Sequence, residues 1–183
     1  MIAVGIDPSL RATGLASVTD DGSITTHRIV TESVEGLQAT ANRIRYIVGG
    51  VVRFVPRGSL VLIEEMFVPQ GGAQAGAVLE RAWLWGLIVD QLFQRGCEVV
   101  TVGAMQRAKL ATGNGHSKKV AVKAAMRERF PGVRIPDDNV ADGLALAAAG
   151  ARWAGFPVDG ALTKKQTEAM AAVAWPTREE MKR

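Results

Sequence analysis

The sequence predicts a single mixed α/β domain, and three observations support this fold class. Short apolar runs typical of buried strands alternate with longer segments that have helical spacing. Asp20, Asp21 and Gly22 stand between two strand-like segments and form a hairpin turn signal, which predicts an antiparallel meander of the first three strands. The chain has 183 residues, of which 48% are hydrophobic, so it can build one sizeable core but not two domains of usual size.

The elements are expected in the order β-β-β-α-β-α-β-α-α. The first strand should end near Asp7, because Pro8 cannot donate to a sheet ladder. A loop is expected around Gly113 and Gly115, and the segment from Phe156 onward is expected to be a mobile tail with room for a short helix. The predicted strands cover residues 2–7, 13–19, 23–30, 60–63 and 98–102, the predicted helices cover 33–54, 75–94, 118–130 and about 138–153, and the loop covers 109–117.

The composition limits the classes of protein that the chain can represent. There are 22 Lys and Arg residues against 18 Asp and Glu, and this net charge of +4 permits an anionic partner without requiring one. The single cysteine, Cys97, excludes an intrachain disulfide and a cysteine-rich zinc site, as expected in a reducing compartment. No secretory leader and no apolar stretch of about 20 residues is visible. We therefore expect a cytoplasmic protein, bacterial or phage-encoded, with no membrane partner.

Acidic side chains stand at the ends of several predicted elements. Asp7 and Glu64 end two apolar strands. At the start of the last helix Asp138 lies four residues and Asn139 three residues before Asp142, and either pair shares one helix face. Each acid taken alone is typical of a turn or a helix cap, but three separate segments each place an acid at an element boundary. Oxygen ligands without a Cys or His set favour Mg²⁺ or Mn²⁺, and such a site suits phosphodiester hydrolysis with two metal ions.

Three segments resemble the signatures of RuvC-type Holliday-junction resolvases, which belong to the RNase H-like nuclease superfamily. They are residues 5–14 (GIDPSLRATG), 63–67 (IEEMF) and 141–148 (ADGLALAA). The resemblance covers residues 1–152 with the segments in order. It implies an RNase H-like fold, in which a five-stranded mixed sheet, three antiparallel strands followed by two parallel ones, is flanked by helices. We expect this nuclease domain at residues 1–155 and the tail at residues 156–183.

The resemblance also implies an activity. Family members are homodimeric, Mg²⁺-dependent endonucleases that nick two opposed strands of a four-way DNA junction during recombination and repair, and the nicks carry 5′-phosphate and 3′-hydroxyl ends. Two ions are expected per active site, and Mn²⁺ should substitute for Mg²⁺. By motif, Asp7, Glu64 and Asp142 correspond to catalytic, metal-binding acids. The family usually has Asp or His three residues before the last acid, where this sequence has Asn139. Either Asn139 or Asp138 is therefore expected as the fourth metal ligand.

Further residues are expected to contact DNA. Phe67 falls where the family places an aromatic residue that unstacks bases at the junction, although core packing is the alternative. Lys109 and Lys119 fall near family lysines that contact phosphate beside the site, and Lys119 is also expected to act in catalysis. Arg11 and Lys118 should contact the backbone as well. More distant phosphate contacts are expected from Arg81, Lys123 and Arg127.

The helix predicted over residues 75–94 is apolar on more than one side. One face can cover the sheet and another can meet a partner subunit, as a two-fold junction requires, although all of it could also be intrachain core. Three other functions remain open at this point. They are a branched- or flap-DNA endonuclease of the same fold with little junction preference, an actin-like ATPase or sugar kinase, and a catalytically inactive DNA-binding protein.

Overall fold

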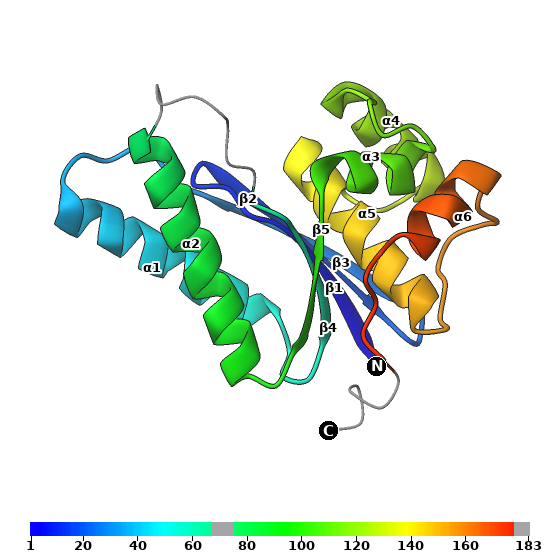
Figure 1. Cartoon of the computed structure of the whole chain (residues 1–183), viewed down its shortest axis with the longest axis horizontal. Coiled ribbons are helices and arrows are strands. Elements are labelled where there is room, and N and C mark those ends of the chain that lie inside the picture. Colours follow the sequence, from blue (N-terminus) through cyan, green and yellow to red (C-terminus); the bar gives the residue numbers. More distant parts are fainter. Residues whose placement is uncertain (67–74, 178–183) are drawn as a thin grey trace.

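The computed structural model describes residues 1–66 and 75–177, and its centre is a five-stranded sheet (Figure 1). The strand order is β3-β2-β1-β4-β5, with β1 antiparallel to β2, β2 antiparallel to β3, and β4 parallel to both β1 and β5. This topology confirms the predicted mixed sheet, with its meander followed by two parallel strands. The strands are β1 (Ile2–Asp7), β2 (Ala12–Thr19), β3 (Ile24–Val30), β4 (Leu60–Glu64) and β5 (Glu98–Val102).

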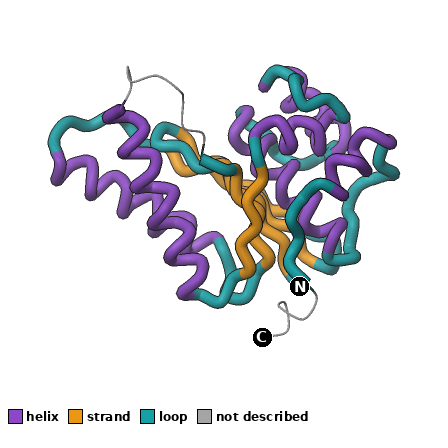
Figure 2. The backbone as a smooth tube through the Cα atoms, viewed as in Figure 1, coloured by secondary structure: helices purple, strands orange, loops and turns teal. Residues whose placement is uncertain are grey.

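Helices cover both faces of the sheet, so the domain has three layers (Figures 1 and 2). One outer layer is formed by α1 (Leu37–Phe54) and α2 (Ala75–Gln94). Among the described residues, no helix is both long and apolar enough to cross a membrane. The central strands β1 and β4 are apolar on both sides, as expected for strands that are covered on both faces. The other layer contains α3 (Ala104–Thr112), α4 (Lys119–Arg129), α5 (Asp138–Trp153) and α6 (Lys164–Ala171).

The helix α3 is absent from the predicted elements, and the loop predicted over residues 109–117 is wrong at residues 109–112, which form the last turn of α3. The helix ends where Gly113 takes a left-handed conformation with φ of 80°, so the glycine signal was correct but the helix before it was missed. The physical reason is that α3 buries a polar residue, Arg107, beside Ala108 and Ala111. This face does not look like an apolar stripe in the sequence.

The predicted mobile tail is also corrected, because the described part of it packs onto the domain. Gln166 of α6 is buried and donates to the carbonyl oxygens of Leu110 and Ala111 at 3.1 and 3.2 Å. Trp175 stacks on Trp153 of α5 with a ring-centroid distance of 5.2 Å. A capping box formed by Thr163 and Gln166 starts α6, and this pair was a helix signal in the sequence.

Glycines let α5 approach the sheet unusually closely. A Cβ atom on Gly14 of β2 would lie 2.0 Å from the carbonyl oxygen of Asn139, and a Cβ atom on Gly5 of β1 would lie 1.9 Å from that of Gly143. Real side chains do not tolerate such distances, so only glycine fits at these two positions. The contact places the first turns of α5 directly against β1 and β2.

Candidate active site

The alternation of side chains along two neighbouring strands directs two acids to the same face of the sheet. Ile6 of β1 pairs with Ile63 of the parallel strand β4. The next residues, Asp7 and Glu64, therefore stand side by side at the same edge of the sheet. Both isoleucines pack on the α1 and α2 side, and because successive side chains point to opposite faces, the following acids point towards α5. The predicted juxtaposition of these strand ends is therefore present in the structure.

The third acid comes from α5. Asp142 is only 1% exposed and lies one turn after the N-cap Asp137, whose side chain accepts a hydrogen bond from the Val140 amide at 3.0 Å. The close contact of α5 with Gly5 and Gly14 brings this turn of the helix to the strand ends. Electrostatic repulsion from both Glu64 and Asp142 acts on Asp7, as expected when all three carboxylates meet.

A residue that the sequence reasoning missed, Arg107, lies among these acids. Its side chain comes from α3, is almost fully buried, and donates from Nε to Glu64 Oε2 at 2.6 Å. A terminal guanidinium nitrogen also donates to Asp142 Oδ1. One arginine thus bridges two of the three acids. Had α3 been predicted, Arg107 would have stood on the same face as Ala111, one turn away, and this charge among core residues was the available signal.

Burial and mutual repulsion nevertheless disfavour the charged forms of two of these acids, in spite of Arg107. Burial, together with repulsion from Glu64 and Asp142, raises the pKa of Asp7 well above its ordinary value. Burial raises the pKa of Asp142 to about 7, although the charge of Arg107 acts in the opposite direction. The second carboxylate oxygen of Asp142, Oδ2, is buried and has no hydrogen-bond partner. An unpartnered buried oxygen is costly and indicates room for a further cation or donor.

The raised pKa of Asp142 predicts how stability depends on pH when no metal is bound. An unfolded chain releases this proton near the ordinary value of 3.8, whereas the folded protein keeps it until about pH 7. Between these values the folded state binds more protons, so its stability falls as the pH rises. We expect wild type to lose unfolding free energy relative to Asp142→Asn from about pH 4 to pH 7. Urea unfolding of both proteins in EDTA measures this, and a difference that grows in favour of wild type would contradict it.

Two more predicted residues meet at the rim of this acidic cluster. Lys119 Nζ, at the start of α4, lies 2.9 Å from Asp138 Oδ2 at the start of α5. Burial opposes the charge of Lys119, but the hydrogen bond with Asp138 and the charges of Asp138, Asp7 and Asp142 raise its pKa. The same hydrogen bond lowers the pKa of Asp138. The half-buried Asn139 follows Asp138 in the first turn of α5.

Some of the other predicted DNA contacts are exposed, whereas others are bonded to groups within the protein. Lys109 pairs with Glu168 of α6 at 3.2 Å. Arg11 is exposed just before β2, and Lys118 is exposed as the N-cap residue of α4. Phe67 lies outside the described residues. Two of the more distant basic residues are engaged in the connection before α5, since Lys123 donates to the Pro136 carbonyl and Arg127 to the Ile135 carbonyl.

A cleft of about 120 Å³ adjoins the acids between the strand ends and α2. It is lined by Asp7, Glu64, Arg81 and Trp85 among others, and the Trp85 indole donates to the Glu64 carbonyl at 3.0 Å. Across residues 1–66 and 75–177, no group of three or more acidic, histidine or cysteine side chains is arranged so that it could hold a metal ion. The donors gather at one place, but with Arg107 among them they are not yet a coordination shell.

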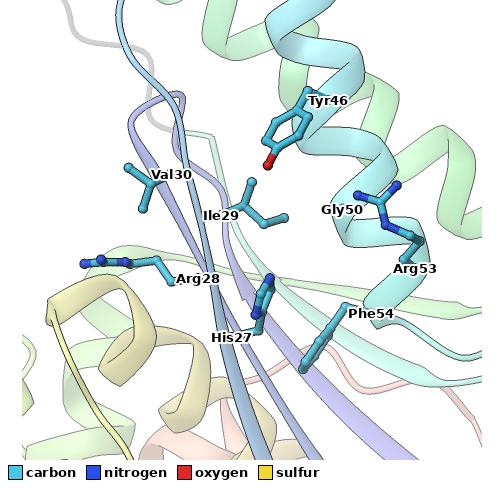
Figure 3. A pocket seen from close by; sticks show the side chains of 8 residues that line it. All are labelled: His27, Arg28, Ile29, Val30, Tyr46, Gly50, Arg53 and Phe54. Atoms are coloured by element: carbon cyan, nitrogen blue, oxygen red, sulfur yellow. The ribbon is translucent and has the colours of Figure 1, made fainter.

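A roomier cavity of about 340 Å³ lies elsewhere, between β3 and α1 (Figure 3). His27 and Phe54 stack in it with ring centroids 6.1 Å apart, and Tyr46 and Arg53 also line it. None of the predicted acids contributes to its wall. We therefore assign the chemistry to the smaller cleft beside the acids.

The mixed sheet between two helical layers, with acids at the ends of neighbouring strands, defines an RNase H-like protein. Two solved structures share the fold. One is titled "T. thermophilus RuvC in complex with Holliday junction substrate", with a TM-score of 0.63, 23% identity, and coverage of 88% of this chain and 99% of that chain. The other is a Thermus thermophilus RuvC structure, with a TM-score of 0.58, 26% identity, and coverage of 87% and 100%.

The sequence comparisons give the particular family. The model of the family described as "Crossover junction endodeoxyribonuclease RuvC" matches residues 3–149. Curated proteins of that name from Methylobacterium radiotolerans and Methylorubrum extorquens PA1 are each 34% identical over 149 residues, which is 79% of this chain and 70% and 76% of theirs. The chain belongs to the RuvC family of crossover junction endodeoxyribonucleases.

Proposed function

We propose that the protein is a structure-selective endonuclease that resolves four-way DNA junctions by paired, symmetric nicks with 5′-phosphate and 3′-hydroxyl ends. The observation that carries the proposal is that acids from three separate segments come together. Asp7 and Glu64 line one cleft, while the buried Asp142 acts electrostatically on Asp7 and shares Arg107 with Glu64. The relatives are named crossover junction endodeoxyribonucleases, and a structural neighbour is described in complex with a Holliday junction. Residues 1–155 would contain the complete nuclease site.

The proposed reaction depends on Mg²⁺, with Mn²⁺ as a substitute and two ions per site. The donors suit such ions, because they are carboxylate oxygens and because Asp142 Oδ2 is buried without a partner. Asp7, Glu64 and Asp142 would hold the metal, with Asn139 or Asp138 as a further ligand. When bound, the metal would activate water and stabilise the departing oxygen.

The remaining side chains would bind and orient DNA. The ammonium group of Lys119 is close enough to Asp7 and Asp142 to act on both charges, so it is suited to hold a phosphate beside the acids. Arg11, Lys109 and Lys118 would extend this positive path along the backbone. In the free protein Lys109 is paired with Glu168, and DNA phosphate would compete with that exposed ion pair. We also propose that Phe67 acts at the junction centre.

The function is tested by a metal-dependent cleavage assay on a synthetic four-way junction with a mobile core. We expect ligatable nicks in two opposed strands with Mg²⁺ or Mn²⁺, and much weaker cutting of three-way, flap and linear substrates. Equal cutting of all substrates would instead identify a branched-DNA endonuclease of low selectivity. Junction binding without cleavage in either metal would contradict the nuclease proposal.

Two coordinated nicks need two active sites, and we propose a homodimer that joins through the outer face of α2. Leu79, Trp83 and Phe93 are 69%, 37% and 59% exposed on this helix. With Gly86 between them, they follow the spacing of three, four and seven residues that marks one helix face. An exposed apolar stripe of this kind is suited to cover the same stripe of a second copy.

Gly86 provides a test of the dimer. A Cβ atom there would meet nothing within 4 Å in the monomer, so a larger side chain leaves the fold intact. We expect Gly86→Arg to shift the protein from dimer to monomer in sedimentation experiments, because the long charged side chain would separate the two helices. Gly160→Arg, at a second open glycine outside α2, is the matched control and should remain dimeric. A wild-type monomer, or a dimeric Gly86→Arg variant, would argue against this interface.

A further inference from the structure

We infer that Arg107 is an internal counter-cation, which holds Glu64 and Asp142 together in the metal-free protein and must release them when the metal binds. The inference rests on the proposed metal-dependent function and adds a competing residue to it. Arg107 would be a positioning residue, since it acts through the acids. Its expected effect is to weaken metal binding in exchange for a stable metal-free site.

The first argument is that Arg107 uses lone pairs that a metal ion would need. Its Nε donates to Glu64 Oε2 at 2.6 Å, and its terminal nitrogen donates to Asp142 Oδ1. A guanidinium group and a divalent cation cannot approach the same carboxylate oxygens at short range, because both are positive and both need the space between the acids.

The second argument is that the acids keep acceptor oxygens that Arg107 does not use. Asp142 Oδ2 is buried and has no hydrogen-bond partner, although the other oxygen of the same carboxylate is engaged by Arg107. Oδ2 therefore keeps free lone pairs for a cation that do not depend on breaking a bond of Arg107. The carboxylate of Asp7 acts electrostatically on Arg107 but forms no hydrogen bond with it among the described residues, so it can also receive the ion.

The third argument is that α3 does not need Arg107 to stay in place. Ala108, Leu110 and Ala111 are buried in the core, and Gln166 of α6 bonds to the last turn of the helix. Gln106 also donates to the Ala169 carbonyl at 3.2 Å. The charge of Arg107 can therefore be removed while its helix remains anchored, so loss of the arginine is separable from loss of the fold.

The experiment measures Mn²⁺ and Mg²⁺ binding by calorimetry, without DNA, for wild type, Arg107→Gln and Arg107→Lys. Removing the competing charge should tighten Mn²⁺ binding by about tenfold or more, since a unit charge at contact distance has a large effect even in a polarisable site. Lysine keeps the charge but cannot bridge both acids at once, so its affinity should lie between the other two. The melting temperature should rise more on metal addition in Arg107→Gln than in wild type.

The outcomes separate the possible failures. Arg152→Gln is the matched control, because it breaks another partly buried arginine pair, with Asp159, and should leave metal affinity unchanged. Unchanged or weaker Mn²⁺ binding in a folded Arg107→Gln protein would overturn the inference but not the proposed function. If Arg107→Gln does not fold, Arg107→Lys must bind Mn²⁺ more tightly than wild type, or the inference fails. A wild-type protein that binds neither ion would defeat the proposed function itself.

Discussion

Asp7→Asn is expected to abolish junction cleavage and, at the same time, to stabilise the metal-free protein. Asp7 is buried at the end of β1, and repulsion from Glu64 and Asp142 adds to the burial that disfavours its charge. Asparagine has nearly the same shape but no charge, so the repulsion disappears. Loss of a metal ligand removes several kcal/mol of transition-state stabilisation, which corresponds to a rate decrease of about 10³-fold.

Both effects can be measured on the same preparation. Single-turnover cleavage of a four-way junction gives the rate, and thermal unfolding in EDTA gives the stability. Glu35→Gln makes the same charge change in the exposed segment before α1 and should alter neither quantity. An active Asp7→Asn protein would contradict the assignment of this acid. An inactive variant that is also less stable would mean that Asp7 is a structural residue.

Gly14→Ala is expected to destabilise the protein strongly. The added Cβ would lie 2.0 Å from the Asn139 carbonyl oxygen and 2.6 Å from the Val140 amide nitrogen. Both are backbone atoms at the start of α5 and cannot rotate away, so the helix must shift. Overpacking of this kind typically costs up to about 3 kcal/mol. Because the same turn carries Asp142, the shift should also disrupt the acid cluster and lower cleavage.

Gly76→Ala is the matched control, because Gly76 lies within α2 and a Cβ atom there meets nothing within 4 Å. Gly76 is in the first turn of α2, where alanine should not destabilise the helix, since alanine has the higher helix propensity. Urea unfolding of the two variants beside wild type measures the contrast. A Gly14→Ala protein as stable as wild type would show that α5 does not touch β2 as closely as described.

The features that could be predicted from the sequence are those that local patterns record. Apolar runs and a hairpin turn signal located the five strands, and the acids at strand ends predicted where Asp7 and Glu64 meet. The sequence did not reveal the register that pairs Ile6 with Ile63. It was enough that parallel strands end at the same edge of a sheet, because this alone predicts that the two acids meet. Asp142 was identified by its motif, while its burial depends on the contact of α5 with Gly5 and Gly14.

The features that could not be predicted are those created by tertiary contact. A single arginine in a polar-looking segment gives no indication that Glu64 and Asp142 will surround it, because these partners are 43 and 35 residues away. Burial of Arg107 also hid α3 from the usual search for an apolar stripe. The packing of α6 was missed for a related reason, since its inward residue Gln166 is polar and finds its partners only on α3.

The packing of α6 against α3 also affects the position of Arg107. The helix that carries Arg107 lies between α5 and α6 and is held by Gln166 and the Lys109–Glu168 pair on its outer side. A chain that stopped at Gly155 would lose these bonds and expose the outer side of α3 to solvent, leaving only its packing against α4 and α5. The C-terminal segment therefore helps to fix the position of α3, and through α3 the position of Arg107 between Glu64 and Asp142, although the segment itself contributes no atom to the acidic cluster.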